Sequence, residues 1–129
     1  MRTPAPVDVV GRFLDEVMSG GRGDSVPDLL ASEPLRDRVE AFRSAFADLR
    51  VRVVRMVAQD ELVAVHVVAT GTQTGAFQGA APTGRSWSSS CTAIYEVRDG
   101  RIVDFWLNWD TLDIVEQLGV VQRAAGVSA

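Results

Sequence analysis

Hydrophobic and polar residues in the first 50 positions follow the period of amphipathic helices. Over Val7–Met18, apolar side chains recur every three to four residues, which predicts a helix with one buried face. The same pattern predicts a short second helix from Ser25, its expected N-cap, to about Ala31, and a third helix over about Leu35–Leu49. We therefore expect the chain to begin with a layer of helices.

The pattern then changes to the two-residue period of β-strands. Arg50–Ala58 alternates arginine with valine and predicts a strand with one solvated face. Leu62–Thr72 is apolar on both faces and predicts a central strand. Two further strands, Ser86–Arg98 and Arg101–Trp109, flank Asp99-Gly100, which is a strong signal for a two-residue hairpin turn.

A short helix over about Thr111–Leu118 is expected to close the fold, with Gly119 as its stop and residues 120–129 as a loose tail. Helices followed by a meander of antiparallel strands indicate an α+β fold, with the helices packed on one face of a curved sheet. The chain has 129 residues, of which 47% are hydrophobic, enough for one domain with a substantial core. We expect a single domain over residues 1–129.

Charge and composition narrow the classes of partner. The net charge of −4 is spread along the chain, which argues against a nucleic-acid partner, because phosphate binding relies on clustered positive charge. No stretch approaches the ~20 apolar residues of a membrane helix, and the N-terminus lacks a secretory signal. We expect no membrane partner and a cytoplasmic location. The single cysteine, Cys91, and the single histidine, His66, predict neither a disulfide nor a metal site.

The predicted hairpin places Asp110 at the end of a row of candidate pocket residues. Counting outward from Arg98 opposite Arg101, the facing pairs are Trp106 with Ala93, Asn108 with Cys91, and Asp110 with Ser89. Strand alternation then puts Trp106, Asn108 and Asp110 on one face of the sheet. An indole, an amide, a thiol and a hydroxyl together are typical of a mostly apolar pocket with a few polar groups.

Asp110 has two competing interpretations. Aspartate is among the best N-caps, and its carboxylate would accept a hydrogen bond from the N–H of Leu112 or Asp113. Alternatively, it is the acid/base group of the pocket. The two roles make opposite demands, because helix N–H groups lower a carboxylate's pKa, whereas proton transfer near neutral pH needs burial that raises the pKa. The sequence pattern leaves both open.

Three segments, GTQTGAFQGAAPTGR, AIYEVRDGRIVDFWLNWD and LDIVEQLG, resemble the SnoaL-like polyketide cyclase family. The family pattern is GTHxGxFxGxPPTG, a strand, a DGKI turn, WxxxD and QLG, and the match covers about residues 42–120. The resemblance implies the cone-shaped α+β barrel of the nuclear-transport-factor-2-like superfamily, often a homodimer packed sheet on sheet. It also implies that Asp110, the aspartate of WxxxD, is the general acid/base for an intramolecular aldol ring closure without metal or organic cofactor.

The chain departs from this pattern at several positions. Gln73 replaces the histidine of GTH, Glu96 replaces a common arginine, and the segment between the second and third helices is cut to residues 32–37.

We expect a cofactor-independent cyclase or isomerase that acts on a hydrophobic, polyketide-like carbonyl substrate. A hydrolase or hydroxylase in the same pocket, and a non-catalytic ligand-binding or dimerisation module, remain open alternatives. Asp110 is the candidate catalytic residue, and the candidate substrate-binding residues are Trp106, Asn108, Gln73, Ser89, Cys91 and Phe77.

Overall fold

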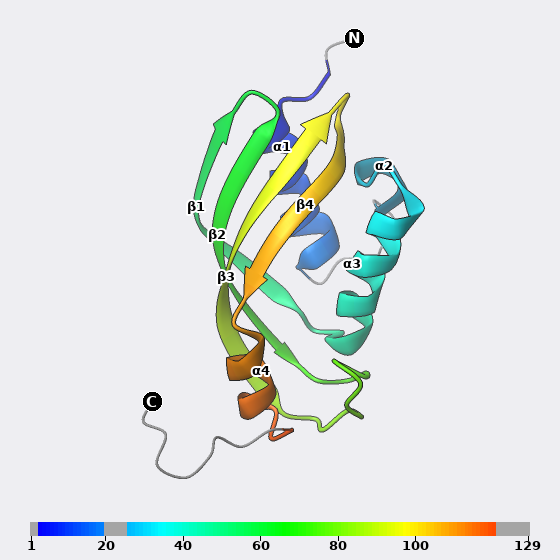
Figure 1. The fold of residues 1–129 in the computed structure, drawn as a ribbon, viewed down its shortest axis with the longest axis vertical. Coiled ribbons are helices and arrows are strands. Elements are labelled where there is room, and N and C mark those ends of the chain that lie inside the picture. Colours follow the sequence, from blue (N-terminus) through cyan, green and yellow to red (C-terminus); the bar gives the residue numbers. More distant parts are fainter. Residues whose placement is uncertain (1–2, 20–25, 121–129) are drawn as a thin grey trace.

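The structure, a computed structural model, describes residues 3–19 and 26–120 and has nine elements (Figure 1). In chain order they are α1 (Pro6–Arg12), the π-helical segment η1 (Phe13–Met18), α2 (Val26–Leu29), α3 (Glu33–Ala45), β1 (Arg50–Gln59), β2 (Leu62–Thr72), β3 (Ser86–Arg98), β4 (Arg101–Trp109) and α4 (Thr111–Gln117). The predicted N-cap Ser25 and most of the predicted tail lie outside the described residues.

The four strands form one antiparallel sheet in the order β1-β2-β3-β4, and the predicted α+β fold is confirmed. The sheet curves, and Figure 1 shows α1 and α3 beside it and α4 near the end of β4. One hydrophobic cluster joins α1, η1 and α3 to the sheet through residues such as Val10, Phe13, Val39, Val65 and Tyr95. All three helical segments therefore cover the same concave face. Within the described residues, none of the helices has the length and apolar character needed to span a bilayer.

The predicted third helix ends earlier than expected because another segment caps it. The backbone N–H groups of Thr74 and Gly75 donate to the carbonyl oxygen of Ala45 at 2.8 and 3.1 Å. This approach needs glycine, because a Cβ at position 75 would lie 2.2 Å from the carbonyl oxygen of Ser44. The loop after β2 is thus fixed to the end of α3.

The predicted turn at Asp99-Gly100 is present, with φ of 51° and 78°, the left-handed values that a tight hairpin requires. The predicted register holds only beside this turn, where Arg98 pairs with Arg101 and Val97 with Ile102. Beyond it the register shifts, and Glu96 pairs with Asp104. Val103 is the additional residue on β4, which makes a β-bulge.

The predicted faces of β4 are wrong beyond the bulge, because a one-residue shift exchanges inward and outward side chains. Trp106 pairs with Ile94 instead of Ala93, and Asn108 pairs with Thr92 instead of Cys91. Both side chains lie on the outer face and are exposed. The pairing of β3 with β4 ends at Cys91 and Trp109, so the predicted pairing of Ser89 with Asp110 is also wrong.

The bulge has a physical reason, which is that it avoids burying the charge of Asp104. In an unbroken strand, Ile102 and Asp104 would share a face, and burying Ile102 would bury a carboxylate at high cost. With Val103 inserted, Ile102 and Phe105 are both buried, at 0% and 4% exposure. Asp104 is only half-buried, and its Oδ1 accepts a hydrogen bond of 2.8 Å from the N–H of Phe105.

The C-terminal helix docks where the partner strand of β3 has ended. The Gln117 amide accepts a hydrogen bond of 2.8 Å from the N–H of Ser88 and donates one of 2.9 Å to the carbonyl of the same residue. One side chain thereby substitutes for a neighbouring strand. Ile114 and Leu118 of this region are fully buried against the sheet.

Candidate functional site

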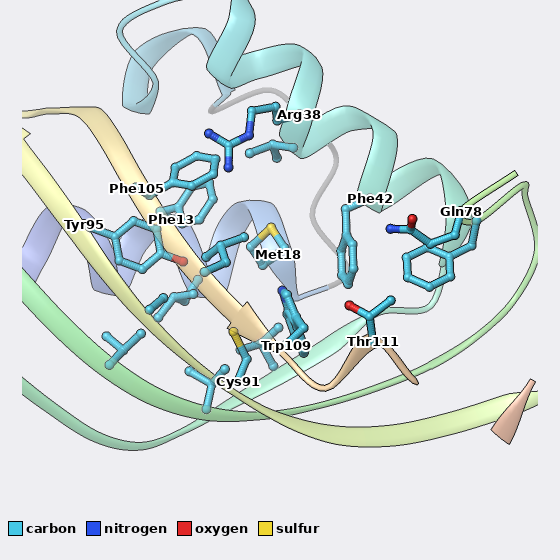
Figure 2. A pocket seen from close by; sticks show the side chains of 18 residues that line it. Phe13, Met18, Arg38, Phe42, Gln78, Cys91, Tyr95, Phe105, Trp109 and Thr111 are labelled. Atoms are coloured by element: carbon cyan, nitrogen blue, oxygen red, sulfur yellow. The ribbon is translucent and has the colours of Figure 1, made fainter. Parts of the chain in front are cut away.

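The concave face of the sheet encloses a cavity of about 160 Å³ between η1, α3 and strands β2, β3 and β4 (Figure 2). Its walls are mostly aliphatic and aromatic, including Phe13, Val39, Val67, Ala93 and Phe105. Such an apolar, partly enclosed space with a few polar groups is what small-molecule sites require.

The Tyr95 hydroxyl is the most buried polar group that faces this space. Tyr95 is 4% exposed and its ring packs edge-on against Phe13, with ring centroids 5.7 Å apart. Figure 2 shows its oxygen directed into the cavity. No described residue forms a hydrogen bond with it. Burial, and secondarily the charge that Cys91 would carry, raises the pKa of this phenol, so Tyr95 is present as a neutral hydrogen-bond donor.

Cys91 lies on the same strand face as Tyr95, four residues away, and lines the cavity. Burial raises the pKa of its thiol to about 11, an effect that a backbone hydrogen bond from Asn108 partly offsets. The thiol donates weakly to the carbonyl of Thr92 at 3.4 Å. A thiol with this pKa is protonated near neutral pH, so Cys91 is a soft apolar wall group and not a nucleophile.

The positively charged side chain of Arg38, on α3, lines the border of the cavity. The Arg38 guanidinium carbon lies 4.2 Å from the centroid of the Phe105 ring, a cation–π contact. Arg38 itself is exposed. The cavity therefore has an apolar interior with a positive charge at its solvent-facing border.

An aromatic cluster bounds the cavity toward α4. The rings of Phe42 and Trp109 are stacked, with centroids 5.3 Å apart and planes at 24°. Behind them, Phe46 and Trp87 pack with centroids 4.9 Å apart. Phe42 and Trp109 line the cavity, whereas Phe46 and Trp87 do not.

Gln73 holds the loop that presents Phe77 to this cluster. Its amide nitrogen donates to the carbonyls of Gly75 and Ala80 at 3.1 and 3.3 Å. Its oxygen accepts from the backbone N–H and the hydroxyl of Thr83 at 3.1 and 3.0 Å. Gln73 is 1% exposed and does not line the cavity. Both donors of the amide are used within the loop, so Gln73 positions the loop and has no N–H left for a ligand.

The structure brings only some of the predicted substrate-binding residues to the cavity. Phe77 and Cys91 line the cavity. Ser89 is 9% exposed and shares the face of Cys91, but it does not line the cavity. Because of the bulge, Trp106 and Asn108 lie on the opposite face of the sheet, in a shallow groove that also contains His66.

Asp110 follows the last residue of β4, between Trp109 and Thr111, which both line the cavity. The carboxylate itself is exposed and is not part of the lining. Its Oδ1 accepts a hydrogen bond of 3.0 Å from the backbone N–H of Asp113, which makes it the N-cap of α4. The predicted cap is therefore confirmed, and no described residue forms a hydrogen bond with Oδ2.

Sequence reasoning missed Tyr95 and Arg38. Tyr95 could have been found, because it continues the alternation of Cys91 and Ala93 on the inward face of β3. Arg38 had no such signal, since the sequence contains many arginines and only the packing of α3 brings this one to Phe105. Among the described residues, no group of three or more His, Cys, Asp and Glu side chains is arranged to hold a metal ion.

Comparisons with known proteins agree with this architecture. The sequence profile of the SnoaL-like polyketide cyclase family matches residues 7–118. A SnoaL-like protein from Jannaschia sp. CCS1 has a similar structure, with a TM-score of 0.80 at 20% identity, covering 95% of this chain and 99% of that one. A comparison with curated protein sequences gave no match.

Two structures from Streptomyces are also similar. IdmH from Streptomyces antibioticus, named as a candidate polyketide cyclase, has a TM-score of 0.73 at 26% identity, covering 91% of this chain and 100% of its own. AclR from Streptomyces galilaeus, named as a candidate hydroxylase, has a TM-score of 0.73 at 20% identity, covering 94% of this chain and 89% of its own. The same fold therefore accompanies differently named activities.

Proposed function

Because this chain belongs to the SnoaL-like polyketide cyclase family, we propose that it binds a hydrophobic, polyketide-like carbonyl compound and catalyses its cyclisation or isomerisation. The observation that carries this proposal is the apolar cavity of about 160 Å³ with the unpaired Tyr95 hydroxyl inside it. Apolar walls would bind the carbon skeleton, and the phenol would donate a hydrogen bond to a ligand oxygen.

Asp110 is the proposed general acid/base. Its carboxylate would remove a proton from the carbon beside a carbonyl, and the enolate carbon would bond to a second carbonyl carbon of the same molecule. The alkoxide oxygen formed there would take the proton back, so the step balances without an oxidant or a reductant. Asp110 lies between two lining residues, and its Oδ2 is free of hydrogen bonds from described residues.

A test uses acetophenone in D₂O, with exchange of its methyl protons followed by NMR. We expect the protein to exchange these protons faster than buffer alone does. With Asp110→Asn, the catalysed rate should fall by about 100-fold or more relative to the unmodified protein. Asp113→Asn is the matched control, because that carboxylate lies on the same helix and bonds Gln117 instead. An exchange rate with Asp110→Asn equal to that of the unmodified protein would show that this carboxylate is not the base.

A second candidate function is a non-catalytic ligand-binding module. It is favoured by the exposure of Asp110 and by its hydrogen bond to the N–H of Asp113, which a helix cap alone explains. In this case acetophenone would bind to the protein while its methyl protons exchanged at the rate in buffer.

We also propose that the chain forms a homodimer through the outer face of the sheet. Val57, Ile94 and Trp106 are 66%, 44% and 49% exposed there, around the groove that contains His66 and Asn108. Apolar side chains gathered on one face favour association with a second protein surface. A copy of the same face would cover them symmetrically.

A further inference from the structure

The size of the cavity limits the ligand. An engineered apolar cavity of about 150 Å³ in another protein binds one benzene molecule. Pockets for larger, drug-sized ligands have volumes of about 300–1,000 Å³. The cavity of about 160 Å³ in this protein therefore encloses one ring and is too small for a fused multi-ring skeleton.

The aromatic cluster is what sets this size. Phe42 and Trp109 are stacked across one end of the cavity, with ring centroids 5.3 Å apart. Trp87 packs against both, with centroid distances of 6.3 Å to Phe42 and 5.9 Å to Trp109. Trp87 does not line the cavity, whereas Phe77, Gln78 and Thr111 do, so the stacked pair narrows the cavity at this end. Phe42 projects from α3 and is half-buried, as Trp109 is, and its ring also contacts Phe77 and Trp87, so its removal would extend the space toward this cluster.

At the other wall, the Tyr95 hydroxyl selects an oxygen-bearing ring. The hydroxyl faces the cavity without a hydrogen-bond partner among the described residues, so it is available to donate to a ligand oxygen. The neighbouring thiol of Cys91 is a weak hydrogen-bonding group and adds no competing charge.

We infer that the site takes a single-ring carbonyl compound, and that Phe42 is the residue that excludes fused rings. The inference rests on the proposed binding of a carbonyl compound in this cavity, but not on the role of Asp110. It names a narrower substrate class than the family does, and it assigns the selection to one side chain on α3.

Two methyl ketones test it, because they differ only in the number of fused rings. The dissociation constants of acetophenone and 2-acetylnaphthalene are measured by isothermal titration calorimetry with the full chain. We expect the protein to bind acetophenone at least about tenfold more tightly, a difference of about 1.4 kcal/mol, because a second ring would have to be forced into a packed cavity. Phe42→Ala should reduce or reverse this preference. Phe46→Leu, in the same cluster but away from the cavity, should keep it.

The outcomes are distinguishable. Equal or tighter binding of 2-acetylnaphthalene by the unmodified protein overturns the size limit while leaving the proposed function in place. An unchanged preference in Phe42→Ala, or in Phe42→Leu if the alanine variant does not fold, overturns the role of Phe42. If neither ketone binds to the unmodified protein or to a folded Phe42 variant, the cavity is not a carbonyl-binding site, and the proposed function fails together with the inference.

Discussion

Asp110 accepts a hydrogen bond of 3.0 Å from the backbone N–H of Asp113 and thereby caps the first turn of α4. This helix carries Gln117, whose amide completes the edge of β3 beyond the end of β4. The candidate catalytic carboxylate is therefore also a structural group. Stability measurements separate the two roles, because asparagine keeps the cap and alanine removes it.

We expect Asp110→Ala to lower the free energy of unfolding by about 1 kcal/mol, the usual cost of losing an N-cap. Asp110→Asn should change it by only a few tenths of a kcal/mol. Urea unfolding followed by circular dichroism measures both. Equal losses in the two variants would mean that the carboxylate charge, and not the hydrogen bond to Asp113, stabilises the helix.

The order and type of the elements could be predicted because each signal is local. Asp99-Gly100 specifies its turn by residue type, and Leu62–Thr72 identifies a central strand by its apolar composition. The face of Trp106 could not be predicted, because it depends on the extra residue at Val103. That bulge follows from the competing burial of Ile102 and exposure of Asp104, a balance that strand alternation alone does not express.

The contrast between local signals and the bulge at Val103 also explains which residues of the candidate site could be predicted. The prediction for Cys91 on the inward face of β3 is correct, because β3 itself contains no extra residue, whereas the prediction for Trp106 and Asn108 names the wrong face of β4. The cap at Asp110 was predictable from residue type at a strand-to-helix junction. Exposure of its carboxylate was not, since exposure depends on how α4 packs on the sheet.

Replacing Tyr95 with phenylalanine should separate binding from stability. The hydroxyl has no hydrogen-bond partner among the described residues, so its removal should leave the free energy of unfolding unchanged or raise it by up to about 1 kcal/mol. Binding of acetophenone should weaken about 5–10-fold, the value of one neutral hydrogen bond. Calorimetric titration gives the affinity. An affinity equal to that of the unmodified protein would show that the ligand oxygen is bound elsewhere.

The Cys91 thiol should make the protein less stable at alkaline pH. An unfolded cysteine has a pKa of about 8.5, and burial raises that of Cys91 to about 11 in the folded chain. Between these values the folded state holds more protons than the unfolded state, so the stabilisation is complete below about pH 8.5 and is lost as pH rises through 11. Urea unfolding from pH 7 to 11 should show this loss.

Cys91→Ala is the reference for this measurement, because it lacks the thiol while Tyr95 titrates in both proteins. The difference in free energy of unfolding between the two proteins should shrink as pH rises through this range. A difference that stays constant with pH would mean that the thiol has the same pKa in the folded and the unfolded chain.

Two glycine-to-alanine substitutions should have opposite effects. Gly75→Ala places a Cβ 2.2 Å from the carbonyl oxygen of Ser44, which forces the loop away from the end of α3 and should cost about 1–3 kcal/mol. Gly11→Ala meets no atom within 4 Å inside a helical run and should stabilise the protein by about 0.5–1 kcal/mol. Melting temperatures report both. A neutral Gly75→Ala would mean that the loop does not need this close approach.

Replacing Trp106 with glutamate should dissociate the proposed homodimer. Trp106 is 49% exposed on the outer face of the sheet, and glutamate there would remove the apolar contact area of the indole and would have to lose its water if two such faces met. Sedimentation velocity should show a dimer for the unmodified protein and a monomer for Trp106→Glu, with the same far-UV circular dichroism. Leu112→Glu is the matched control, because Leu112 is similarly exposed, at 51%, but lies on α4. A monomeric unmodified protein, or a Trp106→Glu variant that remains dimeric, would remove this face as the interface.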